Sequence, residues 1–112
     1  MAAEVVWSPL AHRDLDDIWE WIAIENEEPR AADRTIEAIF DRMDGLAVFP
    51  LAAPSLDSIC RIRSDWRFVE ERGYLAFFRV GDGRVYVDRV LSGKSDYLRK
   101  LIGIDNCIDY YR

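Results

Sequence analysis

Hydrophobic and polar residues follow a helical periodicity up to about residue 49 and a strand-like pattern after residue 65. A short β-prone run over 4–7 comes first, and Ser8-Pro9 ends it. Serine accepts a hydrogen bond from a free N–H at a helix start, and proline at the first helical position has no N–H to leave unpaired. The sequence therefore predicts a strand over 4–7 and then a helix that begins at Pro9.

The region from residue 10 to residue 47 predicts two amphipathic helices joined by a short turn. At about 100° per residue, apolar side chains share one arc in each helix. The arc of the first helix holds Ala11, Leu15, Ile18, Trp19 and Ile22, and that of the second holds Ala32, Ile36, Ile39, Phe40, Met43, Leu46 and Ala47. The first helix should end near Glu25-Asn26 and the second should run from Pro29 to the stop at Phe49-Pro50. So short a break implies an antiparallel helical hairpin.

Three β-prone runs, over 66–69, 74–80 and 85–91, follow an irregular segment over 50–64. Turn residues separate them, so the runs predict an antiparallel meander, with a further helical turn over 97–103. The resulting order is β-α-α-β-β-β, an α+β fold in which the helical hairpin packs on one face of a small, mainly antiparallel sheet that the first strand joins. We expect one domain over 1–112, with tails at Met1–Ala3 and at about 104–112.

Length and composition fit this single domain. The chain has 112 residues, of which 50% are hydrophobic, so it has enough apolar surface for its own core and is not a disordered protein. Its formal net charge of −6 argues against a protein that grips nucleic-acid backbone. Residues 1–50 hold 12 acidic and 4 basic residues, and residues 51–112 hold 9 and 11. The predicted hairpin is therefore acidic and the predicted sheet mildly basic.

Metal, cofactor and membrane sites are not predicted. Cys60 and Cys107 stand in no metal-binding spacing and are expected to be reduced thiols, which suits a cytoplasmic protein. His12 is the single histidine, so no histidine cluster is available for a metal. No stretch approaches the roughly 20 apolar residues that a membrane-spanning helix needs.

Acidic residues crowd the first predicted helix and the turn after it. They are Asp14, Asp16, Asp17, Glu20, Glu25, Glu27 and Glu28. A solvated helix surface explains such a group, with a favourable interaction between Asp14 and the positive end of the helix dipole. We therefore interpret these carboxylates as surface residues and predict no catalytic residue among them.

Two further groups are candidate binding residues. Leu10, Trp21 and Ile24 share a flank of the first helix away from its main apolar arc, so they either pack on the second helix or form an exposed stripe for a partner. Arg67, Arg79 and Arg89 lie in otherwise apolar strands. Each is either paired with a carboxylate such as Asp88, which is favoured for any one of them, or directed at an anionic ligand on the uncovered sheet face.

Three stretches resemble one known family. They are Trp7-Ser8-Pro9-Leu10-Ala11 with the helix after it, Tyr74-Leu75-Ala76-Phe77-Phe78-Arg79-Val80, and the run from Val85 to Asp96. In order and spacing they resemble the ParE branch of the RelE/ParE toxin superfamily from about Glu4 to about Leu101. The resemblance implies the toxin of a bacterial toxin–antitoxin pair, neutralised by a ParD-like antitoxin encoded upstream that lies along the hairpin and the sheet.

The superfamily has two mechanisms, and the sequence favours one of them. RelE-like members cleave mRNA on the ribosome with basic and tyrosine side chains, whereas ParE-like members inhibit DNA gyrase by protein contact. The ribonuclease pattern favours basic residues at the positions of Leu75 and Ser95, and lysines where this chain has Trp66 and Phe68. The absence of these cations and the acidic balance favour gyrase inhibition.

Two other activities stay open at this point. A RelE-type ribonuclease would use Arg67, Arg89 and Tyr97 as its nearest available catalytic set. An inactive, antitoxin-binding remnant would inhibit nothing.

Overall fold

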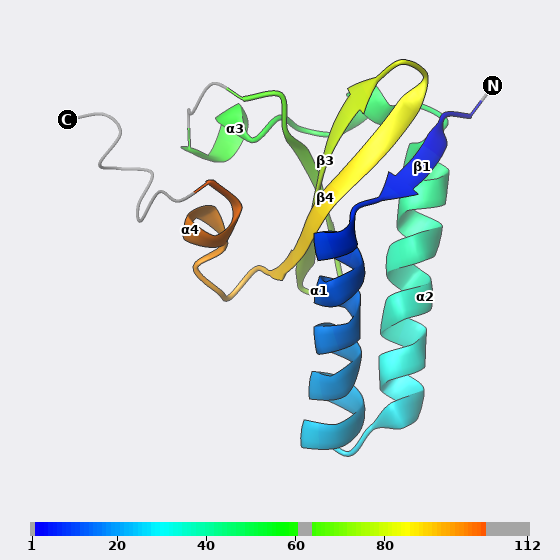
Figure 1. Cartoon of the computed structure of the whole chain (residues 1–112), viewed down its shortest axis with the longest axis vertical. Helices are drawn as coiled ribbons and strands as arrows, with labels where there is room; N and C mark the ends of the chain where they lie inside the picture. Colours follow the sequence, from blue (N-terminus) through cyan, green and yellow to red (C-terminus); the bar gives the residue numbers. More distant parts are fainter. Residues whose placement is uncertain (1, 61–63, 103–112) are drawn as a thin grey trace.

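Four strands form one mixed sheet in the computed structural model, which describes residues 2–60 and 64–102 (Figure 1). They are β1 (Glu4–Trp7), β2 (Arg67–Glu71), β3 (Tyr74–Gly81) and β4 (Arg84–Ser92), in the order β1-β4-β3-β2. β1 pairs parallel with β4, and the other two pairs are antiparallel. The predicted meander and the added first strand are both confirmed.

A helical hairpin covers one face of this sheet, as predicted. α1 (Pro9–Glu20) continues as a π-helical segment, η1 (Trp21–Glu25), and α2 (Pro29–Leu46) returns alongside it. The buried side chains of the hairpin and of the facing strands form the main core, which includes Leu15, Ile18, Ile39, Met43, Phe78, Val85 and Val87. No helix of the described part of the chain is long and apolar enough to cross a membrane.

Trp19 does not belong to this core. The prediction that it shares the apolar arc of the first helix is wrong, because its side chain is 36% exposed and donates its indole N–H to Asp33 Oδ1 at 2.9 Å. A tryptophan has a polar group that needs a partner, so it lies at the rim of the hairpin, where α2 supplies a carboxylate.

Two short helices, α3 (Asp57–Cys60) and α4 (Tyr97–Ile102), lie on the other side of the sheet (Figure 1). α3 and the 3₁₀ turn η2 (Pro50–Ala52) fall within the segment predicted to be irregular, and α4 is the helical turn predicted near the C-terminus. Leu56, Phe77 and Leu91 form a second buried cluster, against which Tyr97, Leu98 and Leu101 pack. The sheet face that was expected to be uncovered is therefore partly covered.

A β-bulge lets two consecutive aromatic residues serve the two cores. The pairing of β3 with β4 shifts between Phe77, opposite Arg89, and Phe78, opposite Val87, so Asp88 is the extra residue. Phe78 is buried in the main core and Phe77 in the second cluster, each with 0% of its surface exposed.

The two hairpin turns of the sheet have positive φ angles at both central residues. These are Arg72 (φ 52°) with Gly73 (φ 85°), and Asp82 (φ 53°) with Gly83 (φ 73°). Two-residue turns of this kind match the twist of the flanking strands, and glycine adopts them without a steric penalty. The turn positions predicted from the glycines are confirmed.

Gly83→Ala should lower the free energy of unfolding by about 1–2 kcal/mol, because an L-residue is disfavoured at positive φ. The space around Gly83 is open, so the cost is one of backbone conformation alone. Gly45→Ala is the matched control in α2: its added Cβ also meets nothing, and it should raise the free energy of unfolding by about 0.5–1 kcal/mol. Urea denaturation measures both; equal effects of the same sign would contradict this account of the turn.

Ala3 donates its N–H to the Ala47 carbonyl at 2.9 Å, so ordered contacts begin one residue before β1. Met1, the tail predicted over 104–112, and the thiols of Cys60 and Cys107 lie outside the residues and side chains that the structure describes.

Candidate functional site

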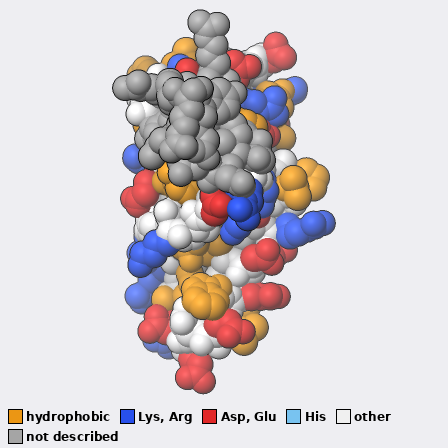
Figure 2. Space-filling view, turned by 90° about the vertical axis from the view of Figure 1, so that its left-hand side faces the viewer, with side chains coloured by type: hydrophobic (Ala, Val, Ile, Leu, Met, Phe, Trp, Pro, Cys, Tyr) orange, Lys and Arg blue, Asp and Glu red, His pale blue; other side chains and the backbone are white. Residues whose placement is uncertain are grey.

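Leu10, Trp21 and Ile24 are exposed. Their side chains are 48%, 56% and 62% accessible, which excludes the interpretation that this flank is buried against α2 and leaves an exposed stripe on α1 and η1. Figure 2 shows the side of the molecule on which α4 lies, and in the lower half of this view hydrophobic side chains stand among basic and acidic ones. Tryptophan is one of the residue types enriched at protein-binding hot spots.

Beside this stripe, Asp14 is buried and forms a forked ion pair with Arg89. Arg89 Nε and Nη2 donate to the two Asp14 oxygens at 2.8 and 3.0 Å, and the Val90 N–H donates to Asp14 Oδ2 at 2.9 Å. The prediction that Asp14 is a solvated surface residue is wrong. Hydrogen bonding to Asp14 raises the pKa of Arg89 above its usual value, which keeps the guanidinium charged.

The position of α1 explains why a carboxylate is needed there. β1 pairs with β4 only as far as Trp7 and Val87, so β4 has a free backbone edge beyond that point. Beyond the end of β1, residues at and after the start of α1 bond to this edge of β4. The Ser8 N–H donates to the Val87 carbonyl at 3.0 Å, and the Asp14 carboxylate accepts from the N–H of Val90, two residues after the bulged residue Asp88. Asp14 therefore satisfies a backbone donor and an arginine together.

Ser8 joins the helix start to the bulge. Its Oγ accepts from the Ala11 N–H at 3.0 Å and donates to the Asp88 carbonyl at 2.8 Å. The N-cap predicted from the sequence is confirmed, and the link to β4 adds to it.

Ser8→Ala should lower the free energy of unfolding by about 1–2 kcal/mol, because it removes a helix cap and a hydrogen bond to the sheet. Ser58→Ala is the control, since its hydroxyl makes a 2.8 Å hydrogen bond at an exposed site and caps no long helix. Thermal unfolding compares them; equal losses would contradict the role given to Ser8.

Arg79 is paired with Asp88, as the favoured interpretation predicts. Nε and Nη2 of Arg79 donate to Oδ2 and Oδ1 of Asp88 at 2.6 and 3.1 Å, and the Trp66 indole N–H donates to the same carboxylate at 2.8 Å. The hydrogen bond with Asp88 is the main cause that raises the pKa of Arg79. The carboxylate of the bulged residue, Asp88, thus accepts two hydrogen bonds from β3 and one from the segment before β2.

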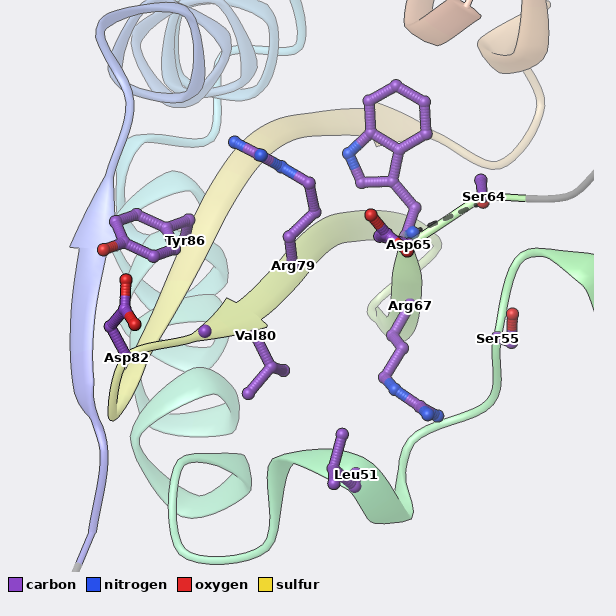
Figure 3. Close-up of a pocket in the computed structure, with 11 residues that line it drawn as sticks. Leu51, Ser55, Ser64, Asp65, Arg67, Arg79, Val80, Asp82 and Tyr86 are labelled. Atoms are coloured by element: carbon purple, nitrogen blue, oxygen red, sulfur yellow. Dashed lines mark hydrogen bonds between the residues drawn. The ribbon is translucent and has the colours of Figure 1, made fainter.

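Arg67 and Arg79 line one pocket of about 450 Å³ at the end of the sheet (Figure 3). Arg67 extends toward the loop that carries Leu51 and donates to the Ala53 carbonyl at 2.7 Å. Asp65 and Asp82 also line the pocket, so its arginines have acidic neighbours.

The structure does not bring the three arginines together. Arg67, Arg79 and Arg89 bind the Ala53 carbonyl, Asp88 and Asp14 respectively, and Arg89 also donates to the Lys100 carbonyl at 3.1 Å. Tyr97 stacks on Phe77 with ring centroids 5.7 Å apart. Each member of the set considered for a ribonuclease therefore contacts a partner of its own. Within the described residues, no group of three histidine, cysteine or acidic side chains is placed to hold a metal ion.

Sequence reasoning missed two features. The first is the burial of Asp14. An arginine inside an apolar strand indicates that a carboxylate partner lies nearby, but the sequence contains many carboxylates and does not show which one it is. The other feature is an exposed apolar segment after α2, where Val48, Phe49 and Leu51 are 49%, 74% and 65% accessible. The sequence feature that could have indicated this segment is the run of apolar residues around Pro50, which follows no helical periodicity.

The helical hairpin on a four-stranded sheet is also found in solved structures of toxin–antitoxin systems. The chain is similar to one solved in a chromosomal ParDE system from P. aeruginosa, with a TM-score of 0.64 and 19% identity over 81% of this chain and 96% of that one. It is also similar to one in the RelBE2 toxin–antitoxin complex from Mycobacterium tuberculosis, with a TM-score of 0.54 and 20% identity over 82% and 99%. No curated protein sequence matches.

The family model described as the ParE toxin of the type II toxin–antitoxin system parDE matches residues 5–97. The chain therefore belongs to the ParE toxin family, and it is a type II toxin of the RelE/ParE superfamily. The resemblance inferred from the sequence motifs is confirmed.

Proposed function

We propose that this toxin inhibits DNA gyrase by protein contact and performs no chemistry of its own. The observation that carries the proposal is the engagement of the sheet arginines: Arg79 and Arg89 are each held by two hydrogen bonds to a carboxylate. A ribonuclease needs cations directed at a developing phosphorane charge. Here these cations neutralise Asp88 and Asp14 instead, and the chain carries Leu75 and Ser95 where the ribonuclease pattern has bases.

We propose that a ParD-like antitoxin, encoded beside the toxin gene, binds and neutralises this toxin. Leu10, Trp21 and Ile24 are the proposed contact residues, because they expose large apolar side chains along α1 and η1. Removal of such apolar surface from water by a partner favours binding. Gyrase and antitoxin both place the protein in the cytoplasm under this proposal.

Supercoiling by purified gyrase tests the proposal. Relaxed plasmid, ATP and gyrase are incubated with increasing amounts of the purified chain, and we expect supercoiled product to disappear as the toxin is added. Pre-incubation with the antitoxin should restore it. Full supercoiling at a large excess of folded toxin would contradict the proposal.

Mapping of mRNA ends in induced cells tests the ribonuclease alternative. The proposal predicts no new 5′ ends within translated codons, whereas a RelE-type activity would produce them. A growth assay addresses the third case: a chain that leaves growth unchanged when it is induced without antitoxin is an inactive remnant.

A further inference from the structure

The two edges of the sheet differ in how their backbone groups are bonded. At the β2 edge, the segment before α3 lies alongside the strand: the Leu56 N–H donates to the Trp66 carbonyl at 2.9 Å, and the Phe68 N–H donates to the Pro54 carbonyl at 3.1 Å. β1 forms the other edge (Figure 1). An edge strand whose N–H and C=O groups are open is a template for pairing with another strand.

The open groups of β1 belong to Val5 and Trp7. Glu4 and Ser8 donate their N–H groups to carbonyls of β4 and of the turn before it, at 3.2 and 3.0 Å. Alternate residues of a strand direct these groups to opposite sides, so the groups of Ala3, Val5 and Trp7 point outward. The Ala3 N–H is bonded to the C-cap residue of α2. Within the described residues, nothing bonds to the outward groups of Val5 and Trp7.

This pattern of donors and acceptors is complementary to itself. When two β1 strands pair antiparallel about a two-fold axis at Val6, Val5 of each copy lies opposite Trp7 of the other. Each such pair exchanges two hydrogen bonds, so every outward group of Val5 and Trp7 is used. A register centred on Val5 pairs Trp7 with Ala3, whose N–H is already bonded, and leaves the Trp7 carbonyl without a donor.

The side chains of β1 are compatible with this pairing. Val5 and Trp7 pack against the main core, so Glu4 and Val6 point to the opposite face. At the axis, Val6 meets Val6 of the second copy, a favourable pair of β-branched residues, and Glu4 lies opposite Ser8, so like charges do not face each other. β1 also contains neither the lysine nor the proline that protects many edge strands from pairing.

Exposed apolar side chains stand at the end of β1. Val48 and Phe49 directly follow the α2 C-cap to which Ala3 is bonded, and they are 49% and 74% accessible. In the register centred on residue 6, Ala3 of one copy lies opposite Pro9 of the other. Val48 and Phe49 therefore face the start of α1 in the second copy, where Leu10 is 48% accessible. The two-fold axis repeats this apolar contact at both ends of the strand pair.

We propose that two copies of this chain form a symmetric dimer in which β1 pairs antiparallel with β1 and the two sheets join into one. The interface consists of one short strand with an apolar contact at each end. Small interfaces of this kind are weak, so the dimer depends on the protein concentration. A strand of another protein is the competing occupant of this edge.

Disulfide cross-linking at the axis tests both the pairing and its register. Facing residues of a non-hydrogen-bonded antiparallel pair have Cα atoms about 4.5 Å apart, within the range of a disulfide. Under mild oxidation, in a chain with Cys60→Ser and Cys107→Ser, Val6→Cys should form a covalent dimer at least about tenfold faster than Glu4→Cys. Glu4 is the matched control because it is more exposed than Val6, while its two copies lie about 13 Å apart along the strands.

Sedimentation velocity measures the association without a cross-link. Between about 1 and 300 µM, the original chain should shift from monomer towards dimer. Val6→Lys places like charges opposite each other and should weaken the dimer about fivefold. Phe49→Ser should weaken it by a similar factor, whereas Ile24→Ser, which changes a side chain 62% accessible near the hairpin turn, should stay within about twofold. Melting temperatures near that of the original chain show that the variants are folded.

The outcomes decide the proposal without reference to gyrase. A monomer at every concentration, with Val6→Cys cross-linking no faster than Glu4→Cys, overturns it and leaves this edge to a strand of another protein. A dimer that cross-links through position 4 in preference to position 6 also overturns it, because the register would differ. Gyrase enters neither measurement, so failure of the proposed function and failure of the dimer are seen separately.

Discussion

Asp14→Ala should lower the free energy of unfolding by about 3 kcal/mol, the lower end of the range for breaking a buried ion pair. The substitution leaves the Arg89 guanidinium without its two carboxylate contacts and the Val90 N–H without an acceptor. The lower end applies because the Arg89 side chain keeps 21% of its surface exposed and can recover some hydration. Urea denaturation measures the loss, and the melting temperature should fall by more than about 10 °C.

A double-mutant cycle shows how much of that loss is the pair itself. Asp14→Ala with Arg89→Ala removes both charges, so the double variant should be less destabilised than the sum of the single variants, by about 1–3 kcal/mol. Asp17→Ala is the control on the same helix; its exposed carboxylate should contribute within about 0.5 kcal/mol. A loss for Asp14→Ala no larger than that for Asp17→Ala would contradict the buried-pair account.

Truncation of Phe77 or Phe78, the two aromatic residues of β3 beside the bulge, should also lower the stability of the fold strongly. Phe78→Ala and Phe77→Ala should each lower the free energy of unfolding by about 3–5 kcal/mol, because each empties a fully buried site on one face of the sheet. For a domain whose total stability is about 5–15 kcal/mol, either loss is severe. Phe49→Ala is the matched control, since its ring is 74% exposed and should contribute within about 0.5 kcal/mol.

Hydrogen exchange distinguishes the two sites. Phe77 contacts the cluster under α4, where the Tyr97 ring stacks on it, so Phe77→Ala should speed exchange of the α4 amides more than that of the α1 amides. Phe78→Ala should affect the hairpin and the sheet together. Equal protection of α4 in both variants would show that the two clusters are one cooperative core.

The helices and strands could be predicted because their signals are local. Apolar residues spaced three and four apart indicate a helix within a short stretch of sequence. The helix start at Ser8-Pro9 and the two glycine turns likewise depend on neighbouring residues alone. Trp19 was misplaced because its spacing fits the apolar arc while its indole N–H needs the Asp33 carboxylate on another helix. Periodicity contains no information about that partner.

The contacts of the site could be predicted where the contacting residues lie close together in the sequence. Arg79 and Asp88 are nine residues apart across a hairpin, and the sequence indicated Asp88 as a carboxylate with which one of the three strand arginines pairs. Asp14 and Arg89 are 75 residues apart, and their pairing depends on where β1 ends and on the free edge of β4 that results. Helical spacing also placed Leu10, Trp21 and Ile24 on one flank, but only the position of α2 decided that the flank is exposed.

We propose that this ParE-family toxin acts on gyrase and not on RNA. One induced culture that lacks the antitoxin measures both activities: plasmid is extracted for its superhelical density while mRNA 5′ ends are mapped in the same cells. We expect plasmid to lose negative supercoiling and no new ends to appear within codons. Plasmid that stays normally supercoiled while translated messages are cut would contradict the account.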